Sequence, residues 1–104
     1  MLPGVPDLLK DTKNYLDITW DDEALDRKLE ELIYQGKSYL SGKLGEEADY
    51  LSPGLPRMLL FDYVRYARDG AADIFENNYA HLILAMQNER LVSRYAQGAD
   101  ETEQ

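Results

Sequence analysis

The stretch Arg57–Ala67 is the most apolar window in an otherwise polar and acidic chain. Wound as a helix, it places Asp62, Arg65 and Asp69 on one narrow stripe, because positions i, i+3 and i+7 share a face. Nearly all of its other positions are apolar, and a helix that is apolar over most of its circumference must be covered on more than one side. The stretch therefore predicts a central helix, ending near residues 69–70, with the other helices packed around it.

The segment before it carries the signals of an amphipathic helix. Asp21 or Asp22 can cap the start, and the acidic first turn favours the positive end of the helix dipole. Gly42 or Gly45 can end it. Gly36 lies on the apolar side, where it either permits a close helix crossing or has no role. The apolar residues recur at helical spacing: Leu25, Leu29, Leu32, Ile33, Tyr39 and Leu40.

A last long helix is predicted from Asp73, which can cap it. Asn88 is a poor helix former and makes Gln87-Asn88 a possible break. The polar, acidic segment 98–104 is expected to be a flexible tail. The apolar positions of this helix again follow the helical period: Phe75, Tyr79, Leu82, Ile83 and Met86, with Leu91, Val92 and Tyr95 beyond the possible break.

The N-terminal part predicts a shorter element. Residues 1–6 form a flexible arm, Asp7–Leu16 a short helix, and the connector after it tucks Ile18 and Trp20 against the core. A long loop, Lys43–Pro56, joins the second and third helices. The fold class is therefore all-α: a single domain, residues 1–104, built as a small bundle of about four helices.

Composition narrows the function classes. The net charge is −9, so the chain gains nothing from DNA phosphates by counterion release, and sequence-specific DNA binding is disfavoured. An acidic surface still suits a wall that DNA slides past. There is no cysteine, which excludes disulfides and thiolate chemistry and suits a cytoplasmic protein. No signal peptide is recognisable, and no apolar run approaches the ~20 residues needed to span a membrane.

Catalytic patterns are missing from the sequence. His81 is the only histidine and has no partner at a catalytic or metal-ligating spacing. The run Asp21-Asp22-Glu23 could bind a cation and so serve a metal-dependent hydrolase, but it lacks the calcium-loop pattern, and a helix cap explains it better. Neither a phosphate-binding glycine motif nor Gly-x-Ser-x-Gly occurs. We expect a protein that is not an enzyme, with no cofactor and no metal.

The aromatic residues indicate an interface. Of the eight tyrosines, Tyr15, Tyr39, Tyr63 and Tyr79 lie on predicted inner faces, whereas Tyr34, Tyr50, Tyr66 and Tyr95 are hard to bury together. Exposed tyrosine beside arginine is typical of protein interfaces. Phe61 and Tyr66 also point away from the residues that three flanking helices can cover. The candidate interface residues are therefore these six: Phe61, Arg65, Tyr66, Arg68, Arg94 and Tyr95.

The ordered series of helix patterns resembles the head–tail connector proteins of tailed phages, also called head-completion or adaptor proteins. The opening, Asp7–Leu40, has the family's short helix ending in Lys-x-Tyr-Leu-x-Ile, an acidic turn, and an amphipathic helix closing in Lys-x-Tyr-Leu. The segments Leu59–Tyr66 and Phe75–Leu84 look like its two later helices. The resemblance spans about residues 7–87.

The resemblance implies a structural virion protein, encoded by a phage or prophage. Such subunits form a ring of about twelve copies beneath the portal of the DNA-filled capsid. The ring extends the DNA channel and docks a tail-completion protein. The implied partners are portal protein, tail-completion protein, other copies of the chain and passing DNA, and no membrane. The implied locations are the head–tail interface of the virion and, during assembly, the host cytoplasm. Portal and lumen contacts would fall in 43–56 and 95–104.

A second interpretation stays open from the residues alone. The same composition fits a small acidic helical regulator that binds another protein, as an antitoxin-like or anti-repressor module does. It predicts a compact dimer with one defined partner, whereas the connector interpretation predicts binding to a portal ring.

Overall fold

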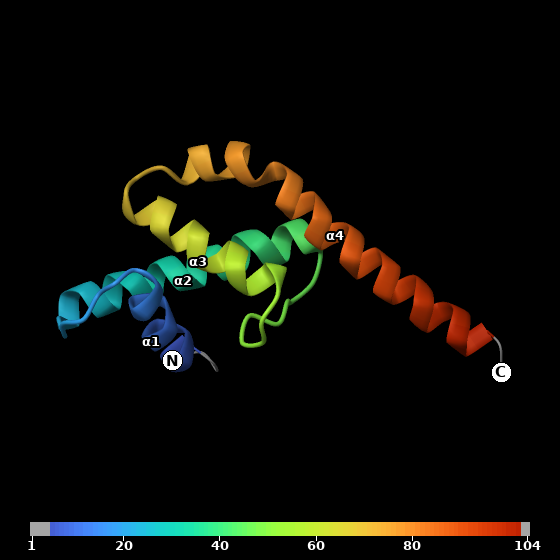
Figure 1. Cartoon of the computed structure of the whole chain (residues 1–104), viewed down its shortest axis with the longest axis horizontal. Helices are drawn as coiled ribbons and strands as arrows, with labels where there is room; N and C mark the ends of the chain where they lie inside the picture. Colours follow the sequence, from blue (N-terminus) through green and yellow to red (C-terminus); the bar gives the residue numbers. More distant parts are fainter. Residues whose placement is uncertain (1–4, 103–104) are drawn as a thin grey trace.

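The computed structural model describes the backbone of residues 5–102 and the side chains of residues 8–96. Within those ranges the chain is all-α, and four helices follow one another without a strand between them (Figure 1). The predicted fold class is confirmed. The helices are α1 (Val5–Tyr15), α2 (Glu23–Leu44), α3 (Leu55–Arg68) and α4 (Ala72–Thr102).

Helix α3 is the central element, as the apolar window predicted. Six consecutive residues, 59–64, are buried, and α3 packs against all three other helices. The residue Pro56 occupies its first turn, where a missing N–H costs nothing. The buried hydrophobic residues around α3 form one core: Leu8, Ile18, Leu29, Leu32, Ile33, Leu40, Tyr50, Leu59, Leu60, Phe61, Tyr63, Val64, Phe75, Ile83 and Met86.

Helix α2 begins and ends at residues with clear capping roles. The carboxylate of Asp22 accepts hydrogen bonds from the backbone N–H groups of Ala24 and Leu25, at 3.0 and 3.2 Å. Gly45 ends the helix in the left-handed conformation, with φ 83°, and its N–H donates to the carbonyl of Ser41. Of the two glycines proposed as the end, Gly45 is therefore the right one, and the helix continues through Gly42.

The close helix crossing proposed for Gly36 is present. Gly36 is buried in α2, and a Cβ atom added there would lie 2.7 Å from Leu60 Cδ1 and 2.8 Å from Tyr63 Cδ1. Both distances are shorter than a van der Waals contact, so the two helices approach to a separation that only glycine allows. This crossing sets the position of α3 on α2.

Three helices also meet at a buried carboxylate. Asp62 of α3 is only 7% exposed and accepts a hydrogen bond from the Tyr15 hydroxyl of α1. Arg65 Nη2 lies 3.8 Å from the same carboxylate oxygen. The hydroxyl of Tyr79, from α4, lies beside it, and burial together with hydrogen bonding to Asp62 raises the pKa of Tyr79 to about 12. A charged group is thus accommodated in the core by polar partners.

The connector between α1 and α2 differs from the prediction at Trp20. Ile18 is buried, but Trp20 is 52% exposed. The chain turns sharply at Asp17, with φ 59°, so that only Ile18 enters the core. Trp20 instead lies on the rim of a cavity of about 480 Å³, which Leu9 and Ile18 also line. The expectation that Trp20 packs against the core was wrong.

Helix α4 is longer and more continuous than predicted. It begins at Ala72, so Asp73 lies in the first turn and is not the cap. No break occurs at Gln87-Asn88, because Met86 is buried and Gln87 Nε2 donates to the carbonyl of Lys43 at 2.7 Å. These contacts outweigh the weak helix propensity of asparagine. The helix extends to residue 102, within the expected flexible tail 98–104; residues 103–104, and residues 1–4 of the expected arm, lie outside the described part.

Candidate interaction surface

The C-terminal part of α4 leaves the bundle. Figure 1 shows this orange-to-red segment extending away from the other three helices. We call residues 91–102 the α4 arm. Among its described side chains, Leu91 is 59% exposed, Val92 68% and Tyr95 82%. Leu84, just before the arm, is 56% exposed. Apolar side chains gathered on one exposed helix are typical of an interaction site.

The root of the arm is fixed by ion pairs to the loop that follows α2. Arg90 binds Glu46 with two nitrogens, one of them 3.0 Å from Glu46 Oε2, and Arg94 Nη2 lies 2.6 Å from Glu46 Oε1. The hydrogen bonds from Arg90, followed by those from Arg94, hold the pKa of Glu46 below its ordinary value. One carboxylate thus ties the start of the α4 arm to the loop that follows α2.

A second pair holds the earlier part of α4 against α2. Lys43 Nζ lies 3.0 Å from Glu76 Oε1, and this hydrogen bond lowers the pKa of Glu76. The carbonyl of Lys43 also accepts the bond from Gln87 described above. The end of α2 is therefore tied to α4 at two points that lie 11 residues apart along α4.

The loop between α2 and α3, residues 45–54, is anchored at its middle by Tyr50. That side chain is 3% exposed; its hydroxyl accepts a hydrogen bond from Ser41 Oγ at 2.8 Å and donates to the carbonyl of Lys37 at 3.2 Å. Asp49 accepts hydrogen bonds from the backbone N–H groups of Leu51 and Ser52. Of the four tyrosines expected to be hard to bury together, Tyr50 is buried because the loop folds back over α2, whereas Tyr34 and Tyr95 are exposed.

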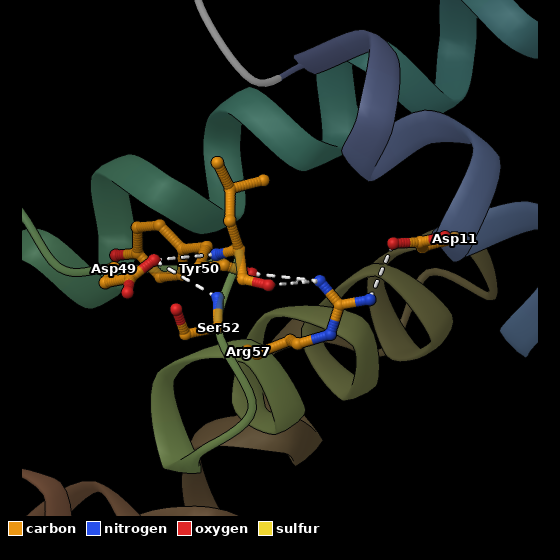
Figure 2. A network of polar contacts seen from close by, with 6 residues as sticks. Asp11, Asp49, Tyr50, Ser52 and Arg57 are labelled. Carbon is orange, nitrogen blue, oxygen red and sulfur yellow. Dashed lines mark hydrogen bonds and ion pairs between the residues drawn. The ribbon is translucent and has the colours of Figure 1, made fainter.

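Arg57 connects that loop to two helices. Figure 2 shows its guanidinium between the loop and α1. Nη1 donates to the carbonyls of Tyr50 and Leu51, at 3.2 and 3.3 Å, and Nη2 lies 2.7 Å from Asp11 Oδ2. A planar guanidinium can make these bonds in two directions at once. The loop that carries Glu46 is consequently held by α3 and α1 as well as by α4.

Phe61, the first of the six predicted interface residues, lies in the core. It is 8% exposed, because Tyr15 packs on it at 5.6 Å between ring centroids and the Arg57 guanidinium lies 4.7 Å from its ring. The expectation that the flanking helices leave Phe61 uncovered was wrong. Helix α1 covers Phe61. The position of α1 along α3 cannot be predicted from the spacing of apolar residues in the sequence.

Tyr66, also expected to point away from the bundle, is partly buried. Its ring meets those of Phe75 and Tyr79 edge to face, at 5.8 and 5.5 Å. Arg65 lies over it at 5.5 Å, and Arg65 and Arg68 are exposed. These residues form one group at the end of α3.

Arg94 and Tyr95 lie apart from that group, on the α4 arm. The structure therefore does not bring the six predicted residues together. The residues that complete the exposed group on α4 are Leu84, Leu91 and Val92. The apolar character of Leu91 and Val92, beyond the last buried position, Met86, was the available signal, but the same pattern also fits a continuation of the core face.

The acidic run at residues 21–23 acts as a helix start. Asp22 is the cap of α2, and Glu23 pairs with Arg27 at 3.3 Å within the helix. Among residues whose side chains are described, no group of three or more histidine, cysteine, aspartate or glutamate residues is arranged to hold a metal ion. None of the described helices combines the length and the apolarity needed to cross a membrane.

Comparisons with known proteins found no relative of this chain. Neither a protein-family model, nor a curated protein, nor a solved structure matches the chain.

Proposed function

We propose that this chain is a head–tail connector subunit of a tailed phage or prophage. In this proposal it assembles as a ring beneath the portal, extends the DNA channel and docks the tail-completion protein. The class of protein is proposed from the resemblance of its ordered helix patterns to those of head–tail connector proteins. The observation that carries the proposal is the α4 arm, with Leu91, Val92 and Tyr95 exposed on a helix that extends from an otherwise packed bundle.

The shape of the subunit supports the same function. Its extents are 55 × 29 × 19 Å, and the arm lies at one end of the long axis (Figure 1). An elongated subunit with an exposed helix at one end can contact a second molecule while its bundle contacts neighbours. When a patch on one subunit binds a different surface on the next subunit, the contact is heterologous. Heterologous contacts form a closed ring when the rotation between successive subunits adds up to a full turn.

The charge of the chain suits a channel wall. Most acidic residues lie on exposed faces, and the net charge of −9 repels DNA phosphates. DNA can then pass through the ring without binding to it. This part of the proposal concerns the assembled ring, located at the head–tail interface of the virion.

Binding to a portal ring tests the proposal. A portal protein of a tailed phage is purified as a ring, and the chain is titrated against it at several salt concentrations. We expect binding by the full chain and weaker binding when residues 95–104 are deleted. Tyr34→Ser is the matched control, since Tyr34 is an exposed tyrosine on α2, away from the arm. No binding at any salt concentration would count against a connector, and binding to one small soluble regulator would favour the alternative interpretation.

A further inference from the structure

We propose that the end of the molecule where α1 and its connector meet the start of α2 binds a basic segment of another protein, with Trp20 as the aromatic anchor. Figure 1 shows the start of α2 at the opposite end of the long axis from the α4 arm. The inference therefore concerns a different surface from the one that carries the connector function, and it does not depend on that function. Three observations support it: a cavity beside Trp20, an acidic cavity that adjoins it, and the local net charge.

The cavity beside Trp20, which we call the Trp20 cavity, has an apolar side. Its volume is about 480 Å³, and Leu9, Ile18 and Trp20 line that side. Trp20 is 52% exposed, although Ile18, two residues earlier, is buried. Tryptophan is among the residues most enriched at binding hot spots, and its ring offers the best aromatic face for a cation. An apolar side chain with a cationic neighbour therefore fits beside this ring.

The polar side of the Trp20 cavity does not favour an anionic ligand. Lys13 Nζ lies 3.3 Å from Asp21 Oδ1 and 2.9 Å from Asp26 Oδ1, and the Lys13 side chain is only 12% exposed. This ammonium is thus already paired with two carboxylates. Lys10 also lines the cavity, so two basic residues face two acidic ones and the charged lining is neutral. Asp21 is fully exposed, and its carboxylate can be reached by a ligand.

A second cavity adjoins the first, and we call it the acidic cavity. Its volume is about 440 Å³, and it shares Asp21 and Asp26 with the Trp20 cavity. Five of its six lining residues are acidic: Asp21, Asp22, Glu23, Asp26, Arg27 and Glu30. The one basic residue, Arg27, pairs with Glu23 at 3.3 Å within α2. A basic side chain that enters this cavity therefore meets several carboxylates.

The net charge of this end favours a basic partner over a second copy of the chain. Segment 17–31 contains seven acidic and two basic residues, so its net charge is −5, more than half of the −9 of the whole chain. Two such ends repel each other, and this end repels the phosphates of a nucleic acid in the same way. A positively charged protein segment is attracted instead, and complementary charge of this kind contributes to specificity and to the association rate.

The occupant is therefore a segment in which arginine or lysine stands beside an apolar residue. The basic side chain binds in the acidic cavity, and the apolar side chain packs on Trp20. Because Asp21 and Asp26 line both cavities, the two side chains come from neighbouring positions of one segment. This arrangement requires both kinds of residue, whereas attraction by net charge alone requires only the basic ones.

The fluorescence of Trp20 tests the proposal, because this is the only tryptophan in the chain. The full chain is titrated with the peptide acetyl-Arg-Leu-Arg-Leu-Arg-amide and with two control peptides, in which serine replaces leucine or glutamate replaces arginine. We expect a saturable shift of the emission to shorter wavelength with the first peptide, weaker binding of the serine peptide and no binding of the glutamate peptide. Unaltered emission overturns the proposal, and so does equal binding of the first peptide and either control.

Substitutions locate the site, with the anisotropy of a fluorescently labelled form of the first peptide as the measurement. Trp20→Ser should weaken binding about ten-fold, as loss of an aromatic anchor does. Tyr34→Ser removes an exposed tyrosine of α2 outside both cavities and should leave binding unchanged. Glu30→Gln should weaken binding about two- to five-fold, whereas Glu89→Gln removes the same charge from α4 and should have no effect. Equal losses within either pair of variants overturn the assignment to these cavities.

The two proposals of this article fail separately. Portal binding is tested by deleting residues 95–104, at the other end of the molecule, and peptide binding by changes in and beside segment 17–31. A chain that binds portal but not the first peptide contradicts only the inference about Trp20. A chain that binds this peptide but not portal contradicts only the connector function.

Discussion

Gly36 of α2 lies directly against the ring of Tyr63 of α3, with room for a hydrogen atom and no more. A Cβ at position 36 would be 2.8 Å from Tyr63 Cδ1. The ring has little freedom to move away, since it stacks on Tyr39 at 5.4 Å and meets the edge of Phe75 at 5.5 Å. The contact between α2 and α3 thus depends on the absence of one side chain.

Gly36→Ala should lower the free energy of unfolding. Overpacking destabilises by about 1–3 kcal/mol, whereas the better helix propensity of alanine stabilises by about 1 kcal/mol. We therefore expect a net loss of stability. Gly42→Ala is the matched control on the same helix, because nothing lies within 4 Å of a Cβ there. It should raise stability by up to about 1 kcal/mol. Urea unfolding measures both; equal gains in the two variants would show that the crossing is not tight.

Arg57→Lys should loosen the loop 45–54 without unfolding the bundle. An ammonium cannot reach both loop carbonyls and Asp11 as the guanidinium does, so about 1–3 kcal/mol of hydrogen bonding is lost. Hydrogen exchange should rise at the backbone N–H groups of Leu51 and Ser52. Asp11→Asn, which removes only the ion pair with α1, should raise it less. Unchanged exchange in Arg57→Lys would mean that Tyr50 and Glu46 hold the loop without the guanidinium of Arg57.

Thr12→Val should stabilise the protein by about 1 kcal/mol. Thr12 is fully buried, and among the described residues its hydroxyl has no hydrogen-bond partner. An unsatisfied buried hydroxyl costs about 1–3 kcal/mol, and valine keeps the shape while removing it. Thermal unfolding measures the change. Thr12→Ala is the control, because it also removes the methyl group and should destabilise by leaving a cavity. A less stable Thr12→Val variant would reveal a bonded hydroxyl.

Glu46→Gln should make the stability of the protein less dependent on pH in the acid range. The arginines hold the pKa of Glu46 below its ordinary value of 4.5 in the folded chain. The unfolded state therefore takes up the proton first, and the stabilisation by Glu46 is complete above pH 4.5 and is lost as the pH falls through the folded pKa.

Chemical unfolding of the wild type and of Glu46→Gln, from neutral pH to below pH 4, measures this effect. The difference in unfolding free energy should shrink as the pH falls. In an Arg90→Gln/Arg94→Gln background the same substitution should show no such trend. A difference that stays constant with pH in the wild-type background would contradict the prediction.

Much of the fold could be predicted from local signals. The apolar window at 57–67, the Asp22 cap and the left-handed Gly45 are properties of single segments, and each lies where the residue chemistry favours it. The continuity of α4 could not be predicted in the same way. It depends on Gln87 reaching the carbonyl of Lys43, which lies 44 residues earlier in the chain.

The candidate surface was predicted only in part. Arg94 and Tyr95 were named, but Phe61 was named as well, and α1 covers it. Periodicity shows which side of a helix is apolar, but not where its partner helices end. The buried and exposed parts of α4 have the same apolar spacing, and only the positions of α2 and α3 separate Met86 from Leu91.

The buried carboxylate of Asp62 has a consequence for how the chain selects a single arrangement. Burying a charge is costly, so the group adds little net stability even with its partners. If α1 slid by one turn along α3, the Tyr15 hydroxyl would move about 5 Å away, and the carboxylate would stay buried but lose this hydrogen-bond donor. Purely apolar contacts, such as those of Leu8, tolerate that kind of slip much better. Asp62 therefore fixes the register of α1 on α3. Registers shifted by one turn would be less stable, because the hydrogen bond from Tyr15 to the buried carboxylate would be lost.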